Sequence, residues 1–178
     1  MSATRRRFIR GPEKESAPGV EVADFSLLPR TGYKGAGTVA WLQSRGFELR
    51  PEPNRAFDQA DGSLVAMLSK SEALILGPMA EGLDAAGRCY SLPRRDSHYW
   101  FLLTGVAIPE LFSKLCGVDL RPVSFANGSV AQTLVARTSA IIIRNQLDYH
   151  LLGDSASATY VWSILAAQVR ELGDHVRR

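Results

Sequence analysis

The sequence predicts an α+β fold in which a strand–helix–strands–helix unit occurs twice and pairs its strands mainly in antiparallel sheets. Two repeated motifs support this duplication. GFELRP at residues 46–51 recurs as GVDLRP at residues 117–122, and GSLVAMLSKSEALIL from Gly62 aligns with GSVAQTLVARTSAIII from Gly128 when one residue is inserted. Internal similarity at a spacing of about 70 residues indicates a duplicated structural unit. Hairpin-length turns between the strand-like runs favour antiparallel pairing.

Length and composition predict one globular domain behind a basic leader. The chain has 178 residues, and its content of 46% hydrophobic residues is typical of a soluble globular protein. Residues 1–20 combine charges with Gly and Pro, which predicts an unstructured leader. Residues 21–173 then form a single domain with two similar halves, at about 21–87 and 98–173.

The first half contains one short helix, a hairpin and a second helix in our prediction. The sequence GTVAWLQSRG at residues 37–46 is helix-like, and Gly46 is placed as its C-terminal stop. The runs GSLVAMLS and EALILG are strand-like and meet at Lys70-Ser71, which predicts a hairpin. The sequence PMAEGLDAAG at residues 78–87 begins with proline at a favourable first helical position, so we expect a helix there.

The second half repeats this pattern and ends in a longer helix. YWFLLTG from Tyr99 is typical of a buried strand, and the helix-like run IPELFSKLCG follows from Ile108. Three further strands are predicted from SVAQTLVA, SAIIIRN and DYHLLG. The last helix, capped by Asp154 or Ser155, carries one apolar stripe. This stripe consists of Val161, Ile164, Leu165, Val169 and Leu172.

The positive charge is concentrated at the two ends of the chain. The formal net charge is +3, and the six arginines within residues 1–10 and 177–178 contribute +6, which leaves residues 11–176 at −3. A nucleic-acid-binding domain is expected to carry a basic face on the fold itself. The charge distribution therefore argues against a nucleic-acid-binding function.

Cysteine content and hydropathy predict a reduced, cytoplasmic location. Cys89 and Cys116 are the only cysteines, which are too few for a disulfide framework or a four-cysteine metal site. No apolar signal segment follows the N-terminal arginines, and no run approaches the ~20 apolar residues of a membrane-spanning helix. We therefore expect neither secretion nor a membrane partner.

The segment from Gly35 to Ala40, GAGTVA, fits the G-x-G-x-x-A pattern of enzymes that bind NAD or FAD. That fingerprint needs a buried parallel strand ending at the first glycine and an acidic residue about 20 positions later. Residues 29–34 are polar and begin with proline, so we do not expect such a strand, and position 55 is an arginine. The corresponding helix start in the second half, Ile108-Pro109, lacks the glycines. We therefore interpret Gly35 and Gly37 as residues that permit a tight entry into a short helix.

Other catalytic patterns are missing from the sequence. It contains no phosphate-binding G-x-x-x-x-G-K-[ST] loop, no H-E-x-x-H and no G-x-S-x-G. His98, His150 and His175 have no partner at metal-ligand spacing. Asp96 and His98 would be suited to an acid–base pair, although a loop-to-strand junction explains them equally well. We predict no catalytic, cofactor-binding or metal-binding residues in this chain.

Several segments, in order and spacing, resemble the gamma subunit of bacterial heterotetrameric sarcosine oxidase. They are DFSLLPRTGYKGAGTVAWL, PEPNRA, LSKSEALIL, CGVDLRPVSF with GSVAQTLVAR, and SATYVWSIL. The resemblance extends from about Val22 to Leu172. Asp154-Ser155 departs from the pattern, which has an arginine before the serine.

The resemblance implies a fold similar to the folate-binding domain of the glycine-cleavage T-protein. It also implies the role of a subunit without its own cofactor in an oxidoreductase complex of sarcosine catabolism. Such a subunit would bind the alpha subunit directly, in a complex that also contains beta and delta subunits and oxidatively demethylates sarcosine to glycine. FAD, FMN, NAD and the tetrahydrofolate that accepts the one-carbon unit would belong to those other subunits.

Two alternatives remain open at the level of sequence. The chain would also suit a free-standing folate-binding one-carbon protein of the T-protein type, or a subunit of a sister enzyme such as an N-methylglutamate dehydrogenase. For the partner interface we select Arg30, Tyr33, Lys34 and Trp41, because exposed aromatic and basic groups at a loop–helix entry are frequent anchors. The opposing interpretation is that Trp41 fills the core and Lys34 is solvated.

Overall fold

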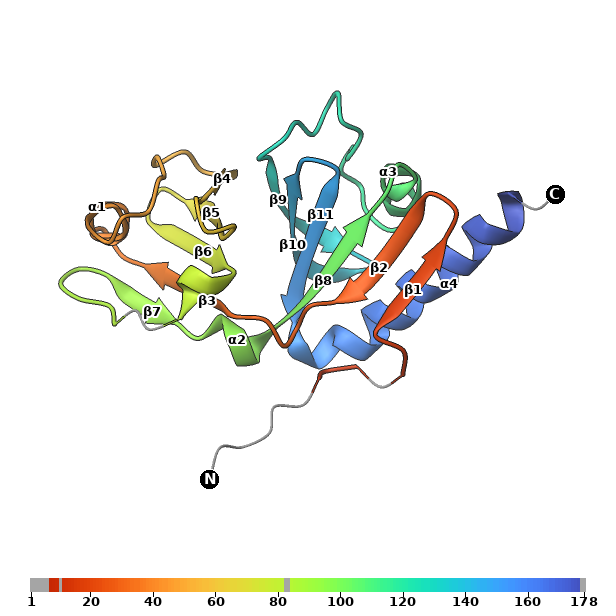
Figure 1. Cartoon of the computed structure of the whole chain (residues 1–178), viewed down its shortest axis with the longest axis horizontal. Helices are drawn as coiled ribbons and strands as arrows, with labels where there is room; N and C mark the ends of the chain where they lie inside the picture. Colours follow the sequence, from red (N-terminus) through yellow and green to blue (C-terminus); the bar gives the residue numbers. More distant parts are fainter. Residues whose placement is uncertain (1–6, 10, 82–83, 177–178) are drawn as a thin grey trace.

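Two antiparallel sheets stand side by side with helices on their outer faces in the computed structural model, which describes residues 7–9, 11–81 and 84–176 (Figure 1). The six-stranded sheet has the order β1-β2-β8-β11-β10-β9 and the five-stranded sheet the order β4-β5-β6-β3-β7. The strands of the six-stranded sheet are β1 (Lys14–Ala17), β2 (Val20–Asp24), β8 (His98–Thr104), β9 (Val130–Val135), β10 (Thr138–Asn145) and β11 (Asp148–Asp154). Those of the five-stranded sheet are β3 (Arg30–Lys34), β4 (Arg55–Asp58), β5 (Leu64–Ser69), β6 (Glu72–Leu76) and β7 (Tyr90–Leu92).

The helices form the two outer layers and the connection between the sheets. They are α1 (Thr38–Ser44), α2 (Arg94–Ser97), α3 (Ile108–Ser113) and α4 (Ala158–Val176), with single 3-10 turns η1 (Pro78–Ala80) and η2 (Ser155–Ser157). Asp154 accepts a hydrogen bond from the Ala156 N–H, which confirms the cap expected before the last helix. No helix in the described part of the chain is long and apolar enough to cross a membrane.

The duplication predicted from the sequence is confirmed by the topology. The series β3-α1-β4-β5-β6 corresponds to β8-α3-β9-β10-β11, because the strands of each series lie in the same relative order in their sheets. Each unit is preceded in the chain by one strand, which we call its lead-in strand. The lead-in strand of each unit pairs with the first strand of the other unit. β2 precedes the first unit and pairs with β8, whereas β7 precedes the second unit and pairs with β3.

The second of the two sequence alignments is wrong by one strand. It matched β5–β6 with β9–β10, whereas the topology matches β4–β5–β6 with β9–β10–β11. Hairpins share a two-residue periodicity that carries no information on position within the sheet, so neighbouring hairpins align almost equally well. The match of residues 46–51 with 117–122 agrees with the topology, since both segments follow the first helix of their unit.

Part of the expected leader is ordered. Lys14–Ala17 forms β1, which pairs with β2, and Ile9 is buried in the main core. Polar edge strands are easily mistaken for loops, because only one of their sides is paired and charged residues protect the other. Residues 1–6 and 10 of the expected leader lie outside the described part of the chain.

The helix expected over residues 78–87 is not formed. Only Pro78–Ala80 makes a 3-10 turn, and Glu81 is extended. Glycines stand directly before this segment and at its end, and both of them, Gly77 and Gly87, have positive φ angles. Residues 82 and 83 lie outside the described part. α3 is also shorter than expected, since it ends at Ser113, and the Leu115 N–H tightens the chain behind it by bonding to the Phe112 carbonyl three residues back.

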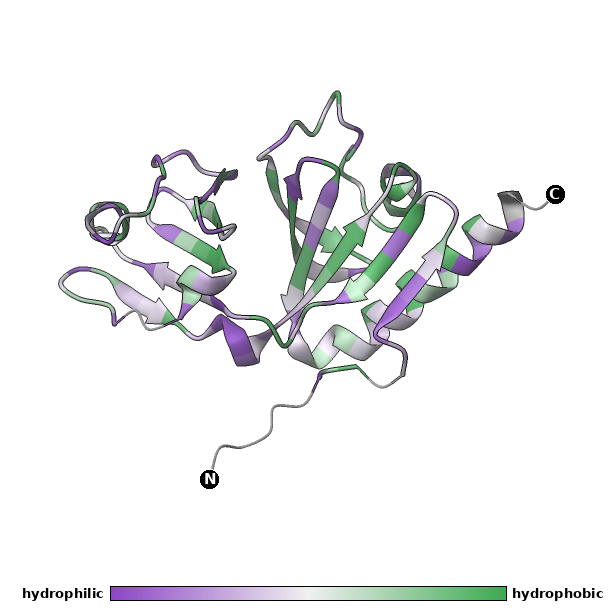
Figure 2. Ribbon diagram, in the orientation of Figure 1, coloured by the Kyte–Doolittle hydropathy of each residue, from purple (hydrophilic) through white to green (hydrophobic). Residues whose placement is uncertain are grey.

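Three apolar clusters separate the layers. The largest lies between the six-stranded sheet and the helices α3 and α4, and includes Phe112 and Leu165. The second lies between the two sheets, where Leu74 of β6 belongs to the same cluster as Trp100 of β8. The third joins the five-stranded sheet to α1 through Leu42. Figure 2 shows hydrophobic residues along the central strands and a strongly hydrophilic α2 between the sheets.

Candidate functional site

The glycines of the GAGTVA motif build a tight corner between β3 and α1. Gly35 has φ +134°, and a Cβ at this position would lie 2.2 Å from the Arg88 carbonyl oxygen. The Gly37 N–H donates to the same oxygen. The corner is therefore filled by the chain's own backbone, and the interpretation of Gly35 and Gly37 as residues that permit a tight turn is confirmed.

The same corner occurs again between β8 and α3. Gly105 has φ +117°, and a Cβ there would lie 2.2 Å from the Gly19 carbonyl oxygen, which accepts a hydrogen bond from the Ala107 N–H. The second half thus keeps the first glycine, contrary to the alignment that placed no glycine there. A feature present at both corners of a duplicated unit indicates a structural role of the fold.

One reason for rejecting the dinucleotide site was wrong, and a different feature of the fold argues against the site. The polar segment before Gly35 does form an interior strand, β3, with Arg30 and Tyr33 buried. However, β3 is antiparallel to both of its neighbours, β6 and β7. The dinucleotide fingerprint requires a parallel strand, so this corner does not have the required geometry.

A groove of about 640 Å³ lies at the N-terminal end of β8, on the face of the six-stranded sheet that is turned toward the five-stranded sheet. We call it the inter-sheet groove and define it by His98, Gln132, Leu134, Ser139, Leu152 and Asp154. These residues come from the ends of β8, β9, β10 and β11, so four strands of the six-stranded sheet form its floor. Alternation of side chains along a strand directs this set toward the five-stranded sheet.

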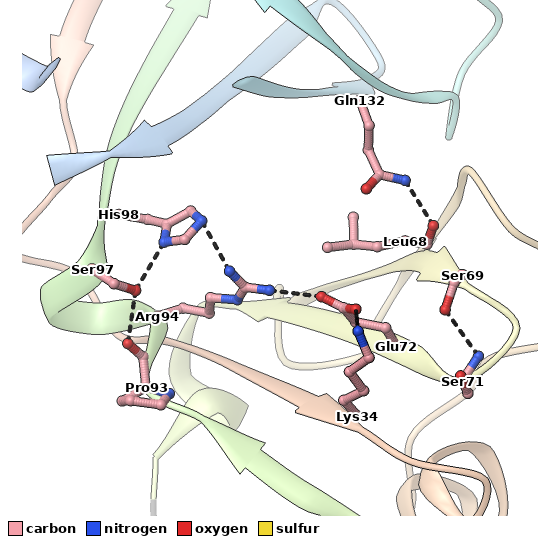
Figure 3. Close-up of polar contacts among 10 residues, drawn as sticks. All are labelled: Lys34, Leu68, Ser69, Ser71, Glu72, Pro93, Arg94, Ser97, His98 and Gln132. Atoms are coloured by element: carbon pink, nitrogen blue, oxygen red, sulfur yellow. Dashed lines mark hydrogen bonds and ion pairs between the residues drawn. The ribbon is translucent and has the colours of Figure 1, made fainter. Parts of the chain in front are cut away.

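A chain of polar contacts closes one side of the groove (Figure 3). Glu72 binds Lys34 Nζ at 3.0 Å through one oxygen and Arg94 Nη2 at 2.7 Å through the other. Arg94 Nη1 in turn lies 3.0 Å from His98 Nε2. Glu72 and Lys34 belong to the five-stranded sheet, whereas His98 begins β8 of the other sheet. α2 therefore carries the residue, Arg94, that links the two sheets electrostatically.

Both ring nitrogens of His98 are engaged. Nε2 accepts from Arg94, and Nδ1–H donates to Ser97 Oγ at 2.9 Å, because the Ser97 hydroxyl donates to the Pro93 carbonyl. Burial, and then the positive charge of Arg94, lowers the pKa of His98 to about 4. The imidazole is therefore neutral near pH 7, and no nitrogen remains for the acid–base pair with Asp96 that the sequence suggested.

The opposite side of the groove is closed by Gln132 of β9. Its Nε2 donates to the Leu68 carbonyl at 2.7 Å (Figure 3). The same Nε2 also donates to Asn54 Oδ1 at 3.1 Å. Next to it, the backbones of the two sheets join directly through the Arg55–Ser129 bridge. The groove thus lies between two fixed connections, so its walls are held by hydrogen bonds on either side.

The four residues selected for a partner interface lie in different environments. Arg30 and Tyr33 are 2% and 1% exposed, so their side chains are inside the fold and do not offer the expected surface. Trp41 is half-buried and packs on Tyr33 with ring centroids 4.7 Å apart. Lys34 has 59% of its side chain exposed and belongs to the polar chain of the groove.

Sequence reasoning missed Glu72, Arg94 and Gln132. The contact between Glu72 and Arg94 joins residues 22 positions apart, and the contact of Gln132 with Leu68 joins residues 64 positions apart. The charged run PRRDSH, residues 93–98, was the one available signal. Within the described residues no group of three or more His, Cys, Asp or Glu side chains is arranged to hold a metal ion.

Comparison with solved structures shows which fold this is. The chain is similar to a chain of the heterotetrameric sarcosine oxidase from Corynebacterium sp. U-96, solved in complex with pyrrole 2-carboxylate, with a TM-score of 0.73 and 17% sequence identity. The match covers 93% of this chain and 88% of that chain. The two chains therefore share one fold over nearly their whole lengths. The sequence matches no protein-family model and no curated protein.

A second solved structure has a similar fold. The glycine cleavage system aminomethyltransferase T from Bartonella henselae is similar with a TM-score of 0.60 and 10% identity. The match covers 84% of this chain but 46% of that chain, so this chain spans about half the length of the aminomethyltransferase. The duplicated α+β fold of the T-protein type expected from the sequence is confirmed.

Proposed function

We propose that this chain is a non-catalytic gamma-type subunit of a heterotetrameric sarcosine oxidase or a sister enzyme, in which it acts as an assembly piece on the alpha subunit. The observation that carries the proposal is the end-to-end correspondence with a chain of similar length from such an enzyme. Sequence segments along residues 22–172 resemble the gamma subunit independently of the structure. In this proposal FAD, FMN, NAD and tetrahydrofolate bind to the partner subunits, and the complex works in the cytoplasm.

The geometry of the chain supports a structural role. The glycine corner is occupied by backbone, and both nitrogens of His98 are bound within the fold. Cys89 is a buried free thiol, and buried apolar surroundings make a cysteine unreactive. His98 and Cys89 are therefore used for internal hydrogen bonds and for packing.

Co-purification tests the proposal. The affinity-tagged full chain, expressed in its source cells, should co-purify with flavin-containing subunits, and the complex should oxidise sarcosine. The chain purified alone should be colourless and inactive. Flavin absorbance at about 450 nm in the isolated chain, or sarcosine turnover by it, would contradict the proposal. The complex should also be assayed with N-methylglutamate, and turnover of this substrate would indicate the sister enzyme.

The groove favours one alternative, a free-standing folate-binding protein of the T-protein type. Its volume of about 640 Å³ is within the range of small-molecule sites. Against this alternative, the nearby carboxylates are engaged, since Glu72 binds two cations and Asp154 caps the turn before α4. Calorimetric titration of the isolated chain with tetrahydrofolate separates the two functions. Saturable binding would favour the alternative, and the assembly proposal expects none.

A further inference from the structure

Four cations, Lys34, Lys70, Arg94 and Arg137, outnumber two carboxylates, Glu72 and Asp154, around the mouth of the inter-sheet groove. Lys34 and Arg94 share a single carboxylate, that of Glu72. Lys70 lies in the turn between β5 and β6, next to Ser69 and Glu72, and Arg137 lies in the turn between β9 and β10, next to the groove residues Leu134 and Ser139. Both turns therefore border the mouth, one on each sheet. Within the described part of the chain neither Lys70 nor Arg137 forms a salt bridge.

Apolar side chains lie beside these cations. Leu134, on the floor of the groove, is 56% exposed, and Tyr90 of β7 is 66% exposed. Tyr90 is paired with Lys34 across β3 and β7, so both side chains leave the sheet on the same face. Exposed aromatic and aliphatic groups surrounded by cations have the composition of a protein interaction surface, in which apolar anchors are accompanied by polar groups at the rim.

We propose that the mouth of the inter-sheet groove docks an acidic segment of the partner subunit. Its carboxylates pair with Lys34, Lys70 and Arg137, and an apolar side chain packs against Leu134 and Tyr90. The inference rests on the proposed assembly function and adds the place and the chemistry of the contact. The open mouth favours a protein segment over a small ligand, because small-molecule sites bury about 70–90% of their ligand. Cations on both sheets match a segment that lies across the groove.

Crosslinking of the purified complex tests the location directly. A carbodiimide joins lysine amines to carboxylates in contact, and this chain has four lysines, of which Lys34 and Lys70 border the groove. Lys14 and Lys114 lie elsewhere and serve as internal controls, with Lys14 at 57% side-chain exposure matching Lys34 at 59%. Mass spectrometry should find crosslinks from Lys34 or Lys70 to Asp or Glu of the partner. Partner crosslinks from Lys14 or Lys114 alone would overturn the inference.

Charge reversal tests the energetics. We expect Lys70→Glu with Arg137→Glu to weaken binding to the subunit complex that lacks this chain by at least about tenfold, and to reduce the dependence of the affinity on NaCl. These two substitutions break no internal salt bridge, so the variant should keep the unfolding temperature of the unaltered chain. The matched control is Lys14→Glu with Arg170→Glu, on β1 and α4, for which we expect a change of less than about twofold.

The outcomes separate this inference from the proposed function. Assembly of the unaltered chain together with unchanged binding of the groove variant would overturn the docking site and leave the assembly function in place. If tetrahydrofolate binds at the groove and no crosslink to a partner is found, the cations would be assigned to a small ligand. That result would also overturn the docking site. If the unaltered chain does not assemble at all, both proposals fail together.

Discussion

Arg30 is the residue on which the connection between the two sheets depends. Its guanidinium donates hydrogen bonds to the carbonyls of Ser26, Leu28, Arg95 and His98. These carbonyls belong to the two segments through which the chain passes from one sheet to the other. A buried cation is tolerated because its five N–H groups satisfy carbonyls that would otherwise be buried without a donor.

We expect Arg30→Ala to lower the free energy of unfolding by about 3 kcal/mol or more, since it removes several charge-assisted hydrogen bonds and leaves a cavity. Arg30→Lys should also destabilise, because one ammonium group does not reach all four carbonyls. Urea unfolding of the isolated chain measures both. Arg170→Ala, at an exposed arginine on α4, is the control and should change stability by less than about 0.5 kcal/mol. An Arg30 variant as stable as this control would show that the connection between the two sheets does not depend on Arg30.

The two corner glycines should be equally intolerant of a side chain. A Cβ at Gly35 or Gly105 would lie 2.2 Å from a backbone oxygen that no side-chain rotation removes. We expect Gly35→Ala and Gly105→Ala each to lower the unfolding temperature by several degrees, corresponding to more than about 1 kcal/mol. Gly117→Ala, which has no atom within 4 Å of the new Cβ, is the control. Scanning calorimetry gives the comparison, and a tolerated Gly35→Ala would remove the argument that this corner is filled.

At the scale of elements, β8 and β11 are joined by a side-chain contact that depends on pH. Trp100 Nε1 donates to His150 Nδ1 at 3.1 Å, and burial lowers the pKa of His150 to about 4. The unfolded chain, with a histidine pKa of about 6.5, binds the proton first as the pH falls. Stability from this residue is therefore complete above about pH 6.5 and is lost between about pH 6.5 and 4.

His150→Asn retains an oxygen acceptor for Trp100 but does not titrate. We expect the stability of the variant to decrease less than that of the unaltered chain between pH 7 and 4.5, by roughly 2 kcal/mol. Because His98 and the carboxylates titrate in both proteins, the difference between the two curves is the quantity to compare. Denaturant unfolding at several pH values measures it. Parallel curves would show that His150 is not the group responsible.

Strong periodicity allowed several elements to be predicted, and weak periodicity explains the errors. The hairpin at Lys70-Ser71, the helix from Thr38 and the long α4 follow from clear apolar patterns and glycine stops. β1 and β3 were missed because their polar residues carry little apolar signal, even though β3 lies between two other strands of its sheet. The groove was not predicted, because Glu72, Arg94 and Gln132 meet only through pairings between distant segments.

At the scale of the whole molecule, the exchange of lead-in strands ties the two units together. β2 lies before β3 in the chain but completes the six-stranded sheet beside β8, whereas β7 completes the five-stranded sheet beside β3. Two backbone hydrogen bonds between the sheets, from Ala56 to Gly128 and from Val130 to Asn54, form a second connection. The five-stranded sheet comes from one continuous stretch, residues 30–92, whereas the six-stranded sheet joins β1 and β2 to strands from residues 98–154. A cut at the boundary between the two units therefore removes a strand from each sheet.

This exchange predicts that the two halves do not fold separately. A fragment of residues 1–87 keeps β1 and β2 without β8, and leaves β3 with an unpaired edge, while residues 88–178 keep β8 without β2. Each fragment would expose apolar sheet surface that the intact chain buries between its sheets, so its folding free energy should be unfavourable.

We expect each fragment alone to lack a cooperative thermal transition by circular dichroism, and the mixture to regain one. The intact chain should unfold in a single transition with equal calorimetric and van't Hoff enthalpies. Independent cooperative unfolding of either fragment would show that its sheet is stable without the exchanged strand.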